Sequence, residues 1–268
     1  MAERVQKLLA AAGHGSRREI ERWIKEGRLR IDGRAAQLGD SVTGDEKFVL
    51  DDQKLSVRKS KAAHQYLIYH KPGDEICSRK DPEGRRVIFE SLPKVQGSRW
   101  VTVGRLDLTT TGLLILTTDG ALANKLMHPS SGLLRRYAVR VHGRPTVDEL
   151  ATLQTGVELD DGRAAFESVE AAGGQGSNRW FQVTLSEGRN REVRRMWEAI
   201  GYQVSRLMRV GYGPVELPPK LRRGKHTAMT PAQVRALYLA AGLQPPPMTV
   251  KIRKKSNQKR MKKQKHRK

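Results

Sequence analysis

The first hydrophobic positions of the chain repeat with the period of an α-helix. Val5, Leu8, Leu9 and Ala12 fall at positions i, i+3, i+4 and i+7, on one face of a short helix. Gly13 follows directly and interrupts this pattern. We therefore expect a first helix of about two turns near the N-terminus.

A second helix is predicted from a capping box. Ser16 stands as the N-cap and Glu19 lies three residues later, where its side chain can bond back to the N-cap backbone. Gly27 marks the end of this helix. The apolar positions that we expect to be buried on it are Ile20, Trp23 and Ile24.

A short hairpin follows the two helices. Leu29 and Ile31 alternate with arginines, and the sequence Asp32-Gly33 is typical of a tight turn between two strands. Basic side chains surround this helix-helix-hairpin frame and suit the phosphates of folded RNA. Those that we expect to bind RNA are Arg17, Arg18, Arg22, Lys25 and Arg28.

Beyond residue 64 the pattern changes to short strand-like runs. Residues 58–64 lack periodicity and are predicted to be a linker. The strand-like runs are residues 65–73, 100–103, 113–116, 135–143 and 181–185. Two helices are expected among them, one capped by Asp119 and ending before His128, the other within 191–201 with an apolar stripe. Because strands outnumber helices and adjoin one another, we predict a mixed, mostly antiparallel α+β sheet.

The predicted organisation has three parts. These are a small N-terminal unit at 1–58, a larger domain at 64–243 and a basic tail at 244–268.

The net charge is +23, and eleven of the 51 basic residues lie in the last twenty positions. The tail reads as a disordered extension. This charge points to a polyanion, with nucleic acid as the first candidate partner. Two alternatives for the tail stay open: it increases solubility, or it binds an anionic membrane surface.

Other features narrow the class of function. A single cysteine excludes an intrachain disulfide framework, and the histidines and this cysteine show no metal-ligand spacing. No phosphate-binding loop or dinucleotide fingerprint appears. No apolar run approaches the length of a membrane span or a signal core. We therefore expect no metal, no nucleotide cofactor and no membrane partner, in a reducing, cytoplasmic setting.

One acidic residue is unusual in this basic chain. Asp107 stands in "GRLDLTTTGLLILTTDG", at the mouth of the most strand-like segment. On the local pattern alone, a carboxylate paired with a surface arginine and a catalytic carboxylate are equally open.

Two resemblances to known families bear on that choice. "RVQKLLAAAGHGSRREIERWIKEGRLRIDGR" with "LGDSV" resembles the S4 RNA-binding domain. "GRLDLTTTGLLILTTDGALANKLMHPS", "RRYAVRV" and "EGRNREVRRMWEAIGYQVSRLMRVGYGP" resemble the RsuA/RluB branch of ribosomal RNA pseudouridine synthases, and "YHKPG" is similar to its first motif. Together the two resemblances cover roughly residues 3–217.

The second resemblance implies an activity and a site. The implied activity is the cofactor-free isomerisation of uridine to pseudouridine in ribosomal RNA, with the base flipped out of the stack. The expected substrate is 23S rRNA, free or in a large-subunit assembly intermediate, and the expected state is a monomer. Asp107 is implied as the catalytic carboxylate, nucleophile or base. Arg194 would pair with it, and Tyr137 would stack on the base.

Further residues match family positions. Arg105 and Arg191 are expected at the RNA, while Leu207 and Gly211 are expected to shape the site. Lys71 is expected either to shape the site with them or to contact the RNA. The alternatives are a core tyrosine for Tyr137 and a solvated basic face for Arg194. His128 is expected to have a structural role at a helix end. The competing hypothesis for the chain is an RNA-binding or ribosome-assembly protein without catalysis, and a membrane-surface protein is a more distant one.

Overall fold

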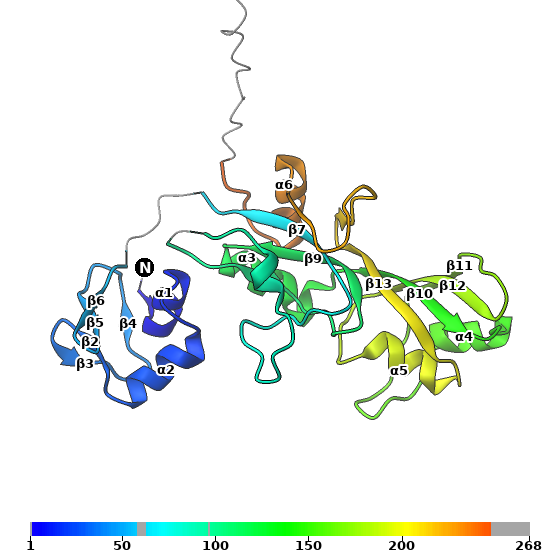
Figure 1. Cartoon of the computed structure of the whole chain (residues 1–268), viewed down its shortest axis with the longest axis horizontal. Helices are drawn as coiled ribbons and strands as arrows, with labels where there is room; N and C mark the ends of the chain where they lie inside the picture. The colour runs from blue at the N-terminus through cyan, green and yellow to red at the C-terminus, as the bar shows by residue number, and fades with distance from the viewer. Residues whose placement is uncertain (1, 58–62, 96, 248–268) are drawn as a thin grey trace, which may run out of the picture.

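The computed structural model describes residues 2–57, 63–95 and 97–247, arranged as a small N-terminal unit and a larger sheet domain (Figure 1). The predicted linker therefore lies mostly outside the described residues. The N-terminal unit contains two helices and two small sheets. Its elements are β1 (Glu3–Arg4), α1 (Val5–Ala11), α2 (Arg17–Lys25), β2 (Leu29–Ile31), β3 (Arg34–Ala35), β4 (Ser41–Val42), β5 (Phe48–Leu50) and β6 (Gln53–Leu55).

The local signals in this unit are confirmed. Ser16 accepts a bond from the Glu19 amide at 3.0 Å, and the Glu19 carboxylate accepts from the Ser16 amide at 3.2 Å, which completes the capping box. Gly27 has φ +71° just past the end of α2. The residues expected on the apolar face of α2 are all buried, in one core with Leu8 and Leu9 of α1. This unit thus owns a separate hydrophobic core.

The larger domain is built on a nine-stranded sheet with the order β11-β12-β10-β13-β9-β7-β15, in which β14 pairs with β13 and β8 with β9. Every pairing is antiparallel except that between β13 and β9. This confirms the predicted mixed, mostly antiparallel α+β fold. The strands are β7 (Tyr66–Lys71), β8 (Val101–Val103), β9 (Thr111–Thr117), β10 (Arg135–His142), β11 (Ser168–Ala171), β12 (Asn178–Leu185), β13 (Val204–Tyr212), β14 (Val215–Glu216) and β15 (His226–Ala228).

Helices pack on the two halves of this sheet (Figure 1). On one half, Trp197 of α5 is fully buried against residues of β10, β12 and β13. On the other half, α3 and α6 pack against β7, β8 and β9. Asp119 caps α3 as expected, accepting from the amides of residues 121 and 122. The helices are η1 (Ile88–Ser91), α3 (Gly120–Met127), η2 (Pro129–Ser131), α4 (Val147–Thr155), α5 (Glu192–Ala199) and α6 (Pro231–Ala240).

The two halves meet where β9 and β13 run parallel. Thr111 lies opposite Met208, and Gly112 lies opposite Arg209. Gly112 has φ +104°, and a Cβ placed there would lie 2.2 Å from the Arg209 carbonyl oxygen. Only glycine permits this approach. The seam therefore brings the loop that precedes β9 next to the middle of β13.

The C-terminal part of the predicted tail, residues 248–268, lies outside the described residues. Among the helices that the structure does describe, none combines the length and the apolar character needed to cross a membrane.

Candidate active site

A cavity of about 570 Å³ opens at the β9–β13 seam, a size within the range of about 300–1,000 Å³ usual for ligand pockets. Its walls come from the loop before β9, from β10 and β13, and from the loop that leads into α5. Asp107 lies in this wall and is half-buried. The other predicted site residues that line the cavity are Arg105, Tyr137, Arg191 and Leu207.

Asp107 is the first residue of a tight turn whose backbone carbonyls accept bonds from Lys71. The Thr110 amide donates to the Asp107 carbonyl at 3.0 Å, which closes the turn. The Lys71 ammonium is completely buried and donates to the carbonyls of Asp107 and Leu108 at 3.1 Å and of Thr110 at 3.0 Å. It also donates to the Pro72 carbonyl at 2.8 Å. The expectation that Lys71 contacts RNA is therefore wrong, because β7 is buried and four carbonyls occupy the ammonium. The other expectation, that Lys71 shapes the site, agrees with these contacts.

Arg194 contacts the same turn. Its guanidinium donates to the Thr109 hydroxyl at 3.1 Å and to the Val204 carbonyl at 2.9 Å. The side chain is 7% exposed, so the solvated basic face is excluded. The expected ion pair with Asp107 is also wrong: within the described part of the chain, no carboxylate oxygen lies within 4.0 Å of the Arg194 guanidinium.

The Asp107 carboxylate nevertheless acts electrostatically on Arg194. Burial lowers the pKa of Arg194, the nearby Arg191 cation lowers it further, and the Asp107 carboxylate partly offsets both. Arg194 lies behind the cavity wall, since it is not among the lining residues of the described cavity. It thus supports the Asp107 turn through its bond to the Thr109 hydroxyl.

Tyr137 is both a core residue and a wall of the cavity. It is 9% exposed and belongs to the hydrophobic cluster around Trp197, as the alternative of a core tyrosine predicted. It also lines the cavity, in register with Arg209 on the neighbouring strand β13. Leu207, 5% exposed, lines the cavity further along the same strand.

Gly211 does not shape this cavity in the structure. Between Arg209 and Gly211 the pairing of β13 with β10 shifts by one residue, so that Tyr137 faces Arg209 while Arg136 faces Gly211. A bulge of this kind reverses the side to which later residues point. A Cβ on Gly211 would accordingly lie 2.5 Å from Arg136 Nε. The expectation that Gly211 shapes the site is therefore wrong.

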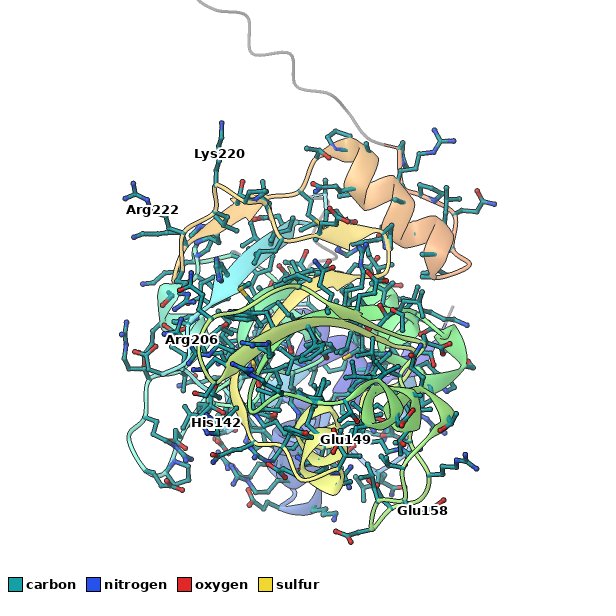
Figure 2. All side chains as sticks on the ribbon, turned by 90° about the vertical axis from the view of Figure 1, so that its right-hand side faces the viewer. His142, Glu149, Glu158, Arg206, Lys220 and Arg222 are labelled. Atoms are coloured by element: carbon teal, nitrogen blue, oxygen red, sulfur yellow. The ribbon has the colours of Figure 1, made fainter. Side chains whose placement is uncertain are left out.

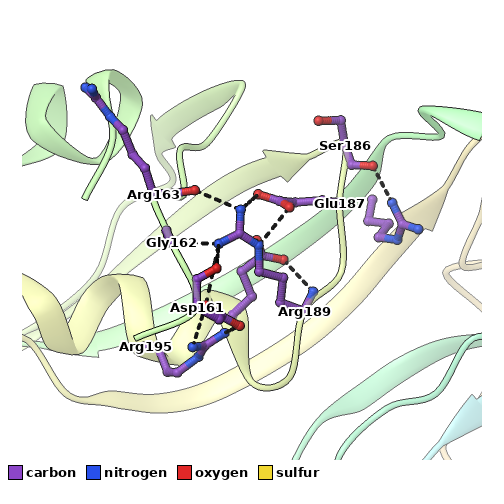
Figure 3. Close-up of polar contacts among 9 residues, drawn as sticks. Asp161, Gly162, Arg163, Ser186, Glu187, Arg189 and Arg195 are labelled. Carbon is purple, nitrogen blue, oxygen red and sulfur yellow. Dashed lines mark hydrogen bonds and ion pairs between the residues drawn. The ribbon is translucent and has the colours of Figure 1, made fainter. Parts of the chain in front are cut away.

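The rim of the cavity is basic and its loop is held in place. Arg105 and Arg191 are exposed at the rim, and Arg191 adopts a left-handed conformation with φ +47° just before α5. Arg189 ties the loop to the segment after α4 through bonds of 2.8 Å to the Gly162 and Arg163 carbonyls (Figure 3). It also pairs with Glu187 at 2.9 Å. Arg191 is thus presented by a tethered loop.

Three buried ionisable residues of the cavity were not predicted from the sequence. Arg135 is 9% exposed and donates to the carbonyls of Leu133 and Ser186 at 2.8 and 2.6 Å. Arg209 and Glu192 are 2% and 3% exposed. Arg209 lies two residues after Leu207, so in a strand both side chains point to the same face. This spacing was the only sequence signal that could have placed Arg209 at the cavity. A charged residue at such a position is normally expected at the surface.

Glu192 gives the site a pH-dependent component. Its carboxylate accepts from the Arg189 amide at 2.9 Å, and one of its oxygens has no hydrogen-bond partner among the described residues. Burial raises the pKa of Glu192 to about 7, with the neighbouring Glu187 adding to the rise. The folded state thus favours the protonated acid, and this contribution to stability is lost as pH rises from about 4.5 to 7.

The parent is expected to lose stability as pH rises from 5 to 8, because Glu192 ionises while buried. Glu192→Gln cannot ionise there, so the difference between its melting temperature and that of the parent should grow in its favour over this range. Thermal unfolding of both proteins across this range measures the difference. Glu158→Gln is the matched control, since Glu158 is an exposed carboxylate (Figure 2), and its difference from the parent should stay flat. A flat difference for Glu192→Gln would contradict the assignment.

The basic residues expected to bind RNA on the N-terminal unit are all exposed. Two of them are already engaged: Arg28 pairs with Glu26 and Asp51, and Arg22 lies 3.7 Å from Glu26. For the others, no carboxylate lies within 4.0 Å among the residues described. These are Arg17, Arg18 and Lys25.

Two further expectations concern His128 and metals. His128 ends α3 and accepts from the Ser130 amide at 3.2 Å, a structural role at a helix end as expected. Within residues 2–57, 63–95 and 97–247, no three or more His, Cys, Asp or Glu side chains are grouped to hold a metal ion.

Comparison with known proteins identifies the larger domain. Residues 65–199, which include the Asp107 turn, Tyr137 and all of α5, match the family model described as RNA pseudouridylate synthase, and residues 3–47 match the S4 domain. The chain belongs to the RNA pseudouridylate synthase family. The synthase is also similar over 87% of its length, with a TM-score of 0.62 and 24% identity, to 99% of a chain in a crystal structure of pseudouridylate synthase. That likeness concerns the fold.

Similar full-length relatives extend the match beyond the family model. The synthase is 51% identical over 265 residues to ribosomal large subunit pseudouridine synthase B of Escherichia coli strain K12, covering 98% of this chain and 91% of that one. It is 50% identical over 252 residues to the protein of that name from Vibrio cholerae, covering 93% and 78%. The similarity thus spans both units.

Proposed function

We propose that this pseudouridine synthase isomerises a uridine of large-subunit (23S) ribosomal RNA. The observation that carries the proposal is the 51% identity, over 98% of the chain, to a relative named for the large ribosomal subunit. A cavity with one carboxylate on a turn, rimmed by arginines, supports the chemistry. The substrate is rRNA, free or within a large-subunit assembly intermediate, and the enzyme works as a cytoplasmic monomer.

The reaction replaces the N1–C1′ glycosidic bond by a C5–C1′ bond and uses one carboxylate. The N1–C1′ bond of uridine breaks, the uracil turns, and C5 bonds to C1′, with no net redox change. Asp107 is the catalytic residue, acting either as nucleophile at C1′ or as base at the sugar. Lys71 and Arg194 are positioning residues, because they fix the backbone and the hydroxyl of the turn that carries this carboxylate.

The target base must leave the RNA stack to reach Asp107. Extruding a base costs on the order of a few kcal/mol, and stacking on an aromatic ring recovers part of it. Tyr137 provides that ring in the cavity wall. Arg105, exposed beside the turn, contacts the RNA or fills the space that the base leaves, and Arg191 contacts the backbone from the other rim.

The N-terminal unit supplies a second RNA contact. We assign residues 1–58 as an S4-type RNA-binding domain, 64–243 as the catalytic domain and 244–268 as a basic tail. Tethering two RNA-binding units makes the second contact intramolecular, which raises overall affinity without a new interaction. Arg17, Arg18 and Lys25 are the side chains best placed for phosphates, ahead of the paired Arg22 and Arg28.

Tritium release from C5-labelled uridine tests the substrate class. C5 loses its hydrogen only when it becomes bonded to carbon, so release reports the reaction itself. We expect release from a large-subunit rRNA transcript or its assembly intermediate, and none from a small-subunit transcript under the same conditions. Release from the small-subunit RNA alone would overturn the large-subunit assignment. No release from either RNA would favour a binding role without catalysis.

A further inference from the structure

Arg209 is a buried cation without a partner of opposite charge. The side chain is 2% exposed, and its Nε donates to the Leu113 carbonyl at 2.9 Å. Its Nη2 has no hydrogen-bond partner, and no carboxylate oxygen lies within 4.0 Å of it in the described residues. A buried, incompletely bonded guanidinium is costly for the folded protein. Its presence points to a partner that arrives with the substrate.

The guanidinium borders the cavity that contains Asp107. Arg209 is one of the lining residues, and its strand places it opposite Tyr137. Its Nη1 lies 3.8 Å from the position of a Cβ on Gly104, in the segment that leads to Asp107. Its Cζ lies 5.2 Å from the centre of the Tyr212 ring, another wall of the cavity. The guanidinium therefore borders the space that a flipped base would enter, and Nη1 is its terminal nitrogen near the segment that leads to Asp107.

Breaking the glycosidic bond creates a charge in that space. When N1–C1′ breaks, its electron pair moves onto the uracil ring and is shared among N1, O2 and O4. The pair is returned when C5 bonds to C1′, after which the C5 proton is lost and N1 gains a proton, so the product is an isomer of the substrate. A donor fixed at O2 or O4 stabilises the uracil more after cleavage than before it.

We propose that Arg209 donates a hydrogen bond to a carbonyl oxygen of the flipped uracil and stabilises the negative charge that develops as the glycosidic bond breaks. This rests on the uridine isomerisation proposed above and adds a second catalytic residue to it. Asp107 acts on the sugar, and Arg209 acts on the leaving base. The cost of burying this cation is offset when the uracil oxygen occupies its free N–H groups.

Arg209→Gln removes the charge and is expected to lower kcat by about 10²–10³-fold, the range for losing one oxyanion donor, with little change in RNA affinity. Arg206→Gln is the matched control: Arg206 lies on the same strand and is exposed (Figure 2), so its loss should leave kcat unchanged. Single-turnover rates and RNA binding separate the two effects. If Arg209→Gln unfolds, Arg209→Lys replaces it; this variant keeps a cation but lacks the planar guanidinium donors, so its kcat should also fall below that of the parent.

Sulfur substitution of the target uridine separates a direct contact from a structural role. The RNA is whichever rRNA the parent converts, so parent activity tests the proposed function independently. Sulfur is a weak acceptor. We expect one of the two substitutions, 2-thiouridine or 4-thiouridine, to slow the parent. The same substitution should not slow the Arg209 variant any further, and this identifies the uracil oxygen that Arg209 contacts. Equal slowing of parent and variant by both substitutions, or an unchanged kcat in Arg209→Gln, would overturn the proposal.

Discussion

Replacement of Asp107 by asparagine is expected to abolish isomerisation while RNA binding stays intact. The amide keeps the size of the side chain but is neither a nucleophile nor a base. The turn should persist, because Lys71 and Arg194 hold its carbonyls and the Thr109 hydroxyl and not the carboxylate. We expect kcat to fall ~10⁴-fold or more, as when a catalytic nucleophile is removed. Tritium release and RNA binding of the same preparation measure the two effects.

Asp160→Asn is the control for this substitution. Asp160 is an exposed carboxylate outside the cavity, so its loss changes the net charge equally and should leave kcat unaltered. Residual activity of Asp107→Asn within tenfold of the parent would show that another group does the chemistry.

Replacement of Lys71 by methionine is expected to have the largest effect on stability. Methionine fills a similar volume but leaves the carbonyls of Asp107, Leu108 and Thr110 without their buried donor. Unsatisfied buried groups of this kind cost about 3 kcal/mol or more in total. For a domain of this size that is a fall in melting temperature of roughly 6 to 12 °C. Activity should fall as well, because the turn that carries Asp107 loses its support.

Lys125→Met provides the comparison, since Lys125 is an exposed lysine of α3 and its loss should change the melting temperature little. A Lys71→Met protein with the parent's stability but weaker RNA binding would restore the original expectation that Lys71 contacts RNA.

The sequence allowed the elements with local signals to be predicted. The capping box at Ser16, the Asp119 cap and the apolar stripe of α5 depend on residues within one turn of each other, and all three are present in the structure. The alternation in 135–143 also predicted β10. Strand β13 was not predicted, because its buried positions include Arg209 and its period is broken by a bulge.

The residues of the site that were predicted wrongly are mostly buried cations. An RNA contact of Lys71 and an ion pair of Arg194 with Asp107 were among the predictions, and both side chains instead bond the turn from inside the protein. Arg209 was not considered at all. A lysine or arginine normally indicates surface, and only the tertiary fold reveals that backbone carbonyls satisfy it. Gly211 was misplaced for a related reason, since a one-residue bulge cannot be read from alternation.

The most direct measurement is the pseudouridine content of large-subunit rRNA after incubation with the parent or with Asp107→Asn, determined by nucleoside analysis. We expect the parent to form pseudouridine at a defined stoichiometry per transcript and the variant, which binds the same RNA, to form none. Pseudouridine formed equally by both proteins would contradict the role of Asp107 in this cavity, and none formed by the parent would contradict the proposed substrate.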